Sequence, residues 1–104
     1  MFDKLFKKKT TFQFSDPENA ACMTCCHVLD DRAPILYVSH DTDDGMWQFL
    51  CGADGHGSEH AKIITLLQAV ELDPSVNALY EMPLGVCAER QTVNAEWKPY
   101  RMES

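Results

Sequence analysis

The stretch from Asp41 to Gly52 constrains the fold of this chain more than any other, because an acidic turn there joins two apolar strand patterns. Residues 34–40 and 46–52 are each rich in aliphatic and aromatic side chains. The five-residue link between them, residues 41–45, ends in Gly45 and has a usual length for a hairpin loop. The pattern predicts an antiparallel β-hairpin with several carboxylates at its tip.

Pairing of the two strands about this loop predicts which side chains share a face of the sheet. A five-residue loop sets His40 opposite Met46 and Tyr37 opposite Phe49. The face that gathers the aromatic residues is the predicted core face, and its members are Ile35, Tyr37, Trp47, Phe49 and Cys51. The other face is still apolar, and its members are Leu36, Val38, His40, Met46, Gln48 and Leu50. Either a helix covers that second face or it is a surface that binds a partner.

Turn residues divide the rest of the chain into short elements. The Cys-rich apolar residues 21–29 form a predicted strand, and residues 85–90 and 96–102 form a predicted antiparallel pair. Short helices are predicted over residues 66–72 and from Asp73-Pro74 through Tyr80. The predicted fold class is therefore α+β, with an antiparallel sheet of four to six strands and two short helices. The 104 residues suffice for a single domain over residues 20–104, preceded by a basic N-terminal segment, residues 1–19.

The charge balance excludes some partners and favours others. The formal net charge is −7, and because residues 1–10 carry four Lys and one Asp, the rest of the chain is more acidic still. A surface of this sign repels the phosphates of nucleic acids and attracts basic proteins. Solubility is the simpler explanation of an acidic surface. We expect no nucleic-acid partner, and we expect a basic protein partner.

Cysteine usage and hydropathy predict a cytoplasmic protein. The five cysteines are an odd number, and the neighbours Cys25 and Cys26 rarely bridge each other without strain, so reduced thiols are expected. No apolar run approaches the length that spans a bilayer. Residues 1–9 also lack the apolar segment of a signal peptide. We therefore expect no membrane partner.

Cys and His residues form a pattern that is compatible with a zinc site. The segment Cys22-x-x-Cys25-Cys26-His27 is followed by Cys51, His56 and His60. Thiolates and imidazoles are ligands that zinc prefers, and in an extended segment the best available set is Cys25, His27, Cys51 and His56. However, Cys22 and Cys25 of a strand point to opposite faces, and free Cys is common in sheet interiors. We predict that no bound metal or other cofactor is needed, and the alternative is a zinc-binding domain.

The sequence contains no motif that predicts an enzyme. Cys51 and Cys87 are candidate thiol nucleophiles, but neither lies in a recognised nucleophile turn. The acidic residues Asp41, Asp43 and Asp44 lack the spacing of an EF-hand calcium loop. No glycine-rich phosphate cradle opens a helix. We therefore predict a protein without enzymatic activity and assign no catalytic residue.

Between residues 22 and 91 the chain resembles a family of small bacterial domains, immunity-protein family thirty-three. The resemblance is carried by the Cys-led strand from Cys22, Tyr37, Trp47-Gln-Phe49, Gly52, Asp54, Asp73-Pro74, Pro83, Gly85 and Glu89-Arg90. These are packing and turn residues, and the family pattern includes no enzymatic motif. The resemblance implies a protein that neutralises a toxin or another enzyme by binding it.

An immunity role, taken with the acidic charge, implies where such a partner binds. Asp41, Asp43 and Asp44 at the hairpin tip are the carboxylates expected to meet a basic surface. Charges at the rim of an interface contribute little affinity, so an apolar anchor is also needed. Met46 and Leu50 are the expected anchors.

Overall fold

The computed structural model describes residues 12–52 and 60–101. Most of the predicted N-terminal segment lies outside these residues, and so does His56. The elements of the described chain are β1 (Ala21–Cys25), α2 (Cys26–Asp31), β2 (Tyr37–His40), β3 (Trp47–Leu50), β4 (Ala61–Thr65), α3 (Leu66–Leu72), the 3₁₀ helix η2 (Pro74–Leu79), β5 (Val86–Glu89) and β6 (Lys98–Arg101).

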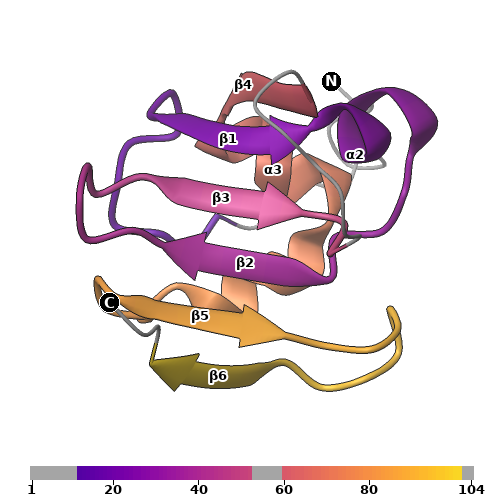
Figure 1. The fold of residues 1–104 in the computed structure, drawn as a ribbon. Coiled ribbons are helices and arrows are strands. Elements are labelled where there is room, and N and C mark those ends of the chain that lie inside the picture. The colour runs from indigo at the N-terminus through magenta and orange to yellow at the C-terminus, as the bar shows by residue number, and fades with distance from the viewer. Residues whose placement is uncertain (1–11, 53–59, 102–104) are drawn as a thin grey trace, which may run out of the picture.

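Six strands form one sheet in the order β4-β1-β3-β2-β5-β6 (Figure 1). β1 and β3 run parallel, with Met23 beside Gln48, and the other neighbouring strands are antiparallel. The predicted α+β class is therefore confirmed, but the sheet is mixed rather than antiparallel. The parallel pair arises because the chain leaves β1 through α2, forms β2, and returns as β3 between β1 and β2.

Helix α2 replaces the second half of the strand predicted over residues 21–29. The strand ends at Cys25, which still has an extended backbone, and the chain turns directly into the helix. Arg32 ends α2 in the left-handed conformation with φ 60°, and the Ala33 N–H donates to the His27 carbonyl at 2.9 Å. A short apolar run without Gly or Pro suits a strand or a helix equally, so the prediction for this segment was wrong.

The register of the β2–β3 hairpin differs by one residue from the prediction. His40 pairs with Trp47, because Asp41 still belongs to the ladder and donates its N–H to the Met46 carbonyl at 2.9 Å. The loop therefore has four residues, 42–45, and Gly45 closes it with φ 73°. The shorter loop moves every side chain of β2 to the face opposite the predicted one.

The predicted positions of Trp47 and Phe49 in the core are confirmed, whereas those of their β2 partners are wrong. Trp47 is 4 % exposed and Phe49 is fully buried. Val38 pairs with Phe49 and is also fully buried, and the His40 ring stacks on Trp47 at 3.9 Å between centroids. Tyr37, which was predicted to be in the core, instead pairs with Leu50 on the opposite face. Of the other predicted core residues, Ile35 is buried and Cys51 is only half-buried.

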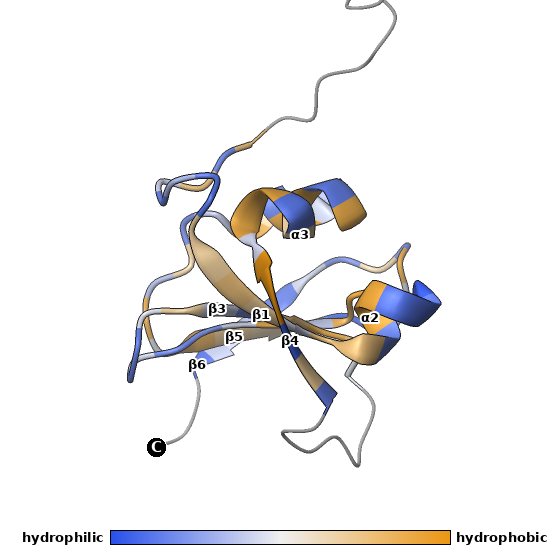
Figure 2. Ribbon diagram, turned by 90° about the horizontal axis from the view of Figure 1, so that it is seen from above, coloured by the Kyte–Doolittle hydropathy of each residue, from blue (hydrophilic) through white to orange (hydrophobic). Residues whose placement is uncertain are grey.

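One face of the sheet is covered and forms the core. Figure 2 shows α3 lying across this face, with α2 at the end of the sheet beside β1 and β4. Leu66, Ala69 and Val70 of α3 are buried against the sheet. Phe14 packs edge-on against Trp47, with 4.8 Å between the ring centroids, and closes the core before β1. Burial of these apolar side chains supplies the main driving force for folding.

The two helices predicted after β4 are confirmed at α3 and η2. Thr65 and Gln68 form a reciprocal capping box at the start of α3, in which each side chain accepts from the other residue's N–H. Asp73 caps η2 through the Ser75 N–H at 3.0 Å, and Pro74 occupies the first position. None of the helices in the described ranges has the length and apolar character needed to cross a bilayer.

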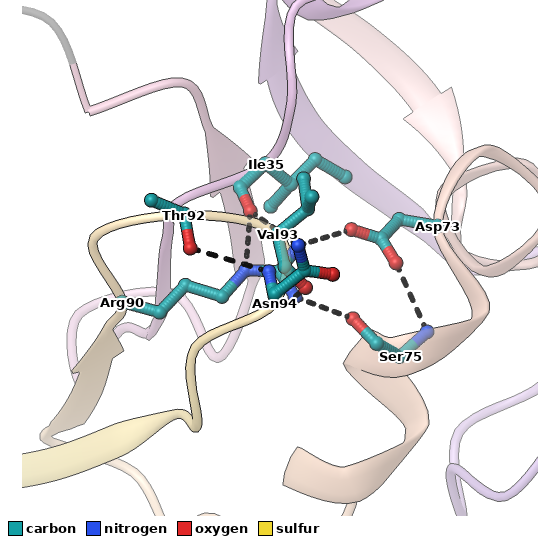
Figure 3. Close-up of polar contacts among 7 residues, drawn as sticks. All are labelled: Ile35, Asp73, Ser75, Arg90, Thr92, Val93 and Asn94. Carbon is teal, nitrogen blue, oxygen red and sulfur yellow. Dashed lines mark hydrogen bonds and ion pairs between the residues drawn. The ribbon is translucent and has the colours of Figure 1, made fainter.

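A buried arginine ties the end of β5 to η2 and to the segment before β2 (Figure 3). The Arg90 side chain is 2 % exposed and pairs with the Asp73 carboxylate. It donates to the Ile35 carbonyl from Nε at 3.1 Å and from Nη2 at 2.8 Å, and to Ser75 Oγ from Nη1 at 3.0 Å. The guanidinium also lies 4.3 Å from the centre of the Trp97 ring. The two bonds to the Ile35 carbonyl join segments that are 55 residues apart in sequence.

Alkaline pH is expected to destabilise the fold through Cys22. Burial raises the pKa of its thiol from 9.0 to about 12. The folded protein keeps this proton while the unfolded chain releases it, so the free energy of unfolding falls as pH rises from about 9 to about 12. Urea denaturation between about pH 8 and about pH 11 measures this slope, and Cys22→Ala should flatten it. An unchanged slope in Cys22→Ala would assign the effect to other groups.

Candidate functional site

The acidic hairpin tip contains one structural carboxylate and two exposed ones. Asp41 accepts hydrogen bonds from Ser39 Oγ at 2.9 Å and from Gln48 Nε2, so it holds the end of the hairpin. Asp44 accepts the Met46 N–H at 2.9 Å and is exposed, as is its neighbour Asp43. Of the three predicted carboxylates, Asp43 and Asp44 therefore project into solvent, and Asp41 is engaged within the fold.

The second face of the sheet is not covered by any helix of the described residues (Figure 2). We call it the open sheet face. The strand pairings place two rows of side chains on it. One row crosses the strands as Ile63, Met23, Gln48, Ser39, Cys87 and Tyr100, and the other as Ala61, Cys25, Leu50, Tyr37, Glu89 and Lys98. Met46, just before β3, alternates with Trp47 and lies on the same side as Leu50.

The open sheet face has an apolar and tyrosine-rich surface. Ile63 at one edge of the sheet is 61 % exposed, and Tyr100 at the other edge is 46 % exposed. Met23, Tyr37 and Leu50 between them are half-buried. Aromatic residues with a polar end are frequent at protein interfaces, because they offer both apolar area and hydrogen bonds.

Two tyrosines and a cysteine on this face form a hydrogen-bonded group. The Tyr100 hydroxyl donates to Glu89 Oε2 at 2.7 Å, and this bond raises the pKa of Tyr100. Burial and a hydrogen bond with Cys87 raise the pKa of Tyr37 to about 12. Cys87 itself is 1 % exposed. Both phenols therefore stay protonated at neutral pH and present hydroxyl groups rather than charges.

Cys and His side chains gather at the end of the sheet where the parallel strands β1 and β3 finish and β4 begins. Five residues meet there: Cys25, Cys26, His27, Cys51 and His60. Parallel neighbours bring their carboxyl ends to the same edge, so the residues that follow β1 and β3 become adjacent. The start of α2 then places Cys26 and His27 over that edge.

The potential donor atoms of this Cys/His cluster are close together. Cys26 Sγ lies 3.6 Å from His60 Nδ1, and Cys51 Sγ lies 4.0 Å from His27 Nδ1. The His27 and His60 rings stack with 5.5 Å between their centroids. Two sets of three donor atoms each fall within 4.8 Å of one another: Cys25, His27 and Cys51, and Cys26, His27 and His60.

The sequence identified part of this cluster. Cys25, His27 and Cys51 were in the ligand set proposed from the sequence and do meet, while the fourth member, His56, lies outside the described residues. Cys22 pairs with Ile64 and does not belong to either set of donors. His60 was part of the Cys/His pattern but not of the predicted ligand set, and it lies directly before β4 with its Nδ1 3.6 Å from Cys26 Sγ. The signal available in the sequence was that His60 lies only three residues before the apolar pair Ile63-Ile64.

Comparisons of this chain with models of known protein families, with curated proteins and with solved structures found no match.

Proposed function

We propose that this protein is a small, non-catalytic binding domain that captures a basic protein partner on its open sheet face. The observation that carries the proposal is the six-stranded sheet with helices of the described residues on one face only. Exposed Ile63 and Tyr100 mark the two edges of that face. An apolar sheet face that lies open to solvent favours a partner, because burying it against another protein removes apolar area from water.

Charge defines the chemistry of the partner. The chain carries a net charge of −7, and Asp43, Asp44 and Glu89 are exposed near or on the open sheet face. Such a rim accelerates the encounter with a positively charged protein, while the apolar centre supplies the affinity. The resemblance to an immunity-protein family implies neutralisation of a basic toxin or enzyme. An acidic rim that speeds the encounter and an apolar centre that supplies the affinity suit that role.

Met46 and Leu50 remain the proposed apolar anchors. Both lie on the side of β3 that is opposite to Trp47 and Phe49, which are in the core. Leu50 is half-buried and packs partly against the core, so its side chain has a fixed position on the face. An anchor that is already ordered loses little conformational entropy on binding.

A cytoplasmic location is part of this proposal. Cys22, Cys25, Cys26 and Cys87 are free thiols. Free thiols in a folded domain are typical of proteins in a reducing compartment.

Removing the two exposed tip carboxylates is expected to slow association with the partner. Asp43→Asn combined with Asp44→Asn keeps the side-chain size and the oxygen that accepts the Met46 N–H. We expect the association rate constant to fall roughly tenfold at low ionic strength, with little change in the dissociation rate. Stopped-flow mixing with the partner at two salt concentrations measures both quantities.

The matched control is Glu71→Gln, which removes an exposed carboxylate from α3 on the covered side of the sheet. It should leave the association rate nearly unchanged. Equal effects of the control and the tip substitutions would indicate that net charge alone guides the encounter and would remove the hairpin tip from the mechanism.

A further inference from the structure

We propose that the Cys/His cluster is a binding site for one zinc ion, with Cys26, His27, Cys51 and His60 as its ligands. This site is separate from the open sheet face, and it requires no protein partner. The four residues come from three segments, namely the start of α2, the residue after β3 and the residue before β4. All four are half-buried, so an ion can reach them while the surrounding protein still limits access of water.

Distances between the donor atoms support this ligand set. Zinc–sulfur and zinc–nitrogen bonds of about 2.3 Å and about 2.0 Å in a tetrahedron place sulfur and nitrogen about 3.5 Å apart. Cys26 Sγ and His60 Nδ1 are 3.6 Å apart, and Cys51 Sγ and His27 Nδ1 are 4.0 Å apart. Two edges of the coordination tetrahedron are therefore nearly formed, and His27, which is in both sets of close donor atoms, lies between the two pairs; side-chain rotation is required to bring all four donors onto one ion.

The stacked imidazoles connect the two pairs. His27 belongs to both groups of close donor atoms, and its ring lies 5.5 Å from the ring of His60. The main chain at His27 is held in place, because the His27 carbonyl accepts the hydrogen bond from Ala33 that ends α2. Cys25 is 2 % exposed and is therefore the least accessible of the three nearby thiols.

The donor types select the metal. Two thiolates and two imidazoles suit zinc, whereas calcium and magnesium prefer oxygen ligands. Binding requires that the two thiols release their protons, so zinc displaces protons from Cys26 and Cys51 and no electrons are transferred. The acidic chain, with exposed Asp30 and Asp31 at the end of α2, attracts a cation to this region.

A zinc ion at this position cross-links three segments of the chain, the start of α2, the residue after β3 and the residue before β4. The ion connects the ends of β1 and β3 to the start of β4, which is the edge strand of the sheet. Because the unfolded chain does not hold these ligands together, zinc binding stabilises the folded state. Bound zinc therefore raises the midpoint of thermal unfolding.

Titration of the purified, reduced protein with zinc and with cobalt(II) tests the proposal. We expect one zinc per chain and a cobalt complex with the intense visible absorption of tetrahedral coordination and with sulfur-to-metal charge transfer from two thiolates. Cys26→Ser and Cys51→Ser should each weaken zinc binding by more than about 100-fold, since outer-shell changes alone cost up to that amount. His60→Asn, at a half-buried site, serves as a third ligand variant.

The control is Cys87→Ala, which removes a buried thiol from the open sheet face and leaves the cluster intact. It should bind zinc like the unmodified chain. Circular dichroism verifies that each variant is folded before titration. Octahedral cobalt spectra, substoichiometric zinc, or unchanged affinity in the folded Cys26→Ser, Cys51→Ser and His60→Asn variants would overturn the assignment.

Discussion

Replacing Phe49 by alanine is expected to lower the free energy of unfolding by about 3–5 kcal/mol, as large-to-small changes of buried aromatic residues do. Phe49 is fully buried in the central strand β3, and its ring lies 6.2 Å from that of Trp47 and 6.4 Å from that of Phe14. The surrounding fold is a single sheet with one helical layer, and Phe49 lies between the two. Small domains are stable by only about 5–15 kcal/mol, so this loss threatens folding itself.

Urea denaturation followed by tryptophan fluorescence measures the effect. The control is Leu84→Ala, because Leu84 is 49 % exposed and should cost less than about 1 kcal/mol. If Phe49→Ala cost as little as Leu84→Ala, the assignment of the covered face as the core would be wrong.

The second large effect is expected at the ion pair between Arg90 and Asp73. Asp73→Asn removes the countercharge of a guanidinium that is 2 % exposed, and it leaves an oxygen that can still cap η2. Removing one member of a buried pair typically costs about 3–5 kcal/mol, and because Asp73 is 20 % exposed we expect about 3 kcal/mol.

Arg90→Lys tests whether the stability comes from the positive charge at this position or from the hydrogen-bonding geometry of the guanidinium. A lysine keeps the positive charge, but it cannot reach Ile35, Ser75 and Asp73 at once as the planar guanidinium does. We expect both substitutions to reduce the denaturant midpoint substantially, and Asp73→Ala to lose about a further 1 kcal/mol for the cap. A midpoint that is unchanged in Asp73→Asn would show that the pair contributes no net stability.

The sequence predicted correctly the elements whose structure depends on a few neighbouring residues. The acidic turn ending in Gly45 predicted the hairpin, and the Asp73-Pro74 pair predicted the break between α3 and η2. Trp47 and Phe49 were placed correctly because their alternation with Gln48 follows from strand geometry alone. These features depend on a few neighbouring residues, and no distant contact overrides them.

Features that depend on distant contacts were not predicted. The loop of four residues rather than five follows from the pairing of Asp41 with Met46, which reversed the faces assigned to Tyr37 and Val38. The parallel pairing of β1 with β3 and the turn into α2 at Cys26 reflect tertiary packing. For the same reason the sequence suggested Cys and His as ligands but did not predict that His60 lies next to Cys26.

Site-specific photocrosslinking in cells that naturally produce the protein tests the central claim, a basic partner on the open sheet face. A photoreactive phenylalanine analogue is placed at Tyr100 on this face or at Glu71 on α3, both of which are exposed. The proposed function predicts a single dominant crosslink to a basic protein from position 100 and none from position 71. Crosslinks of equal yield from both positions, or none from position 100, would contradict it.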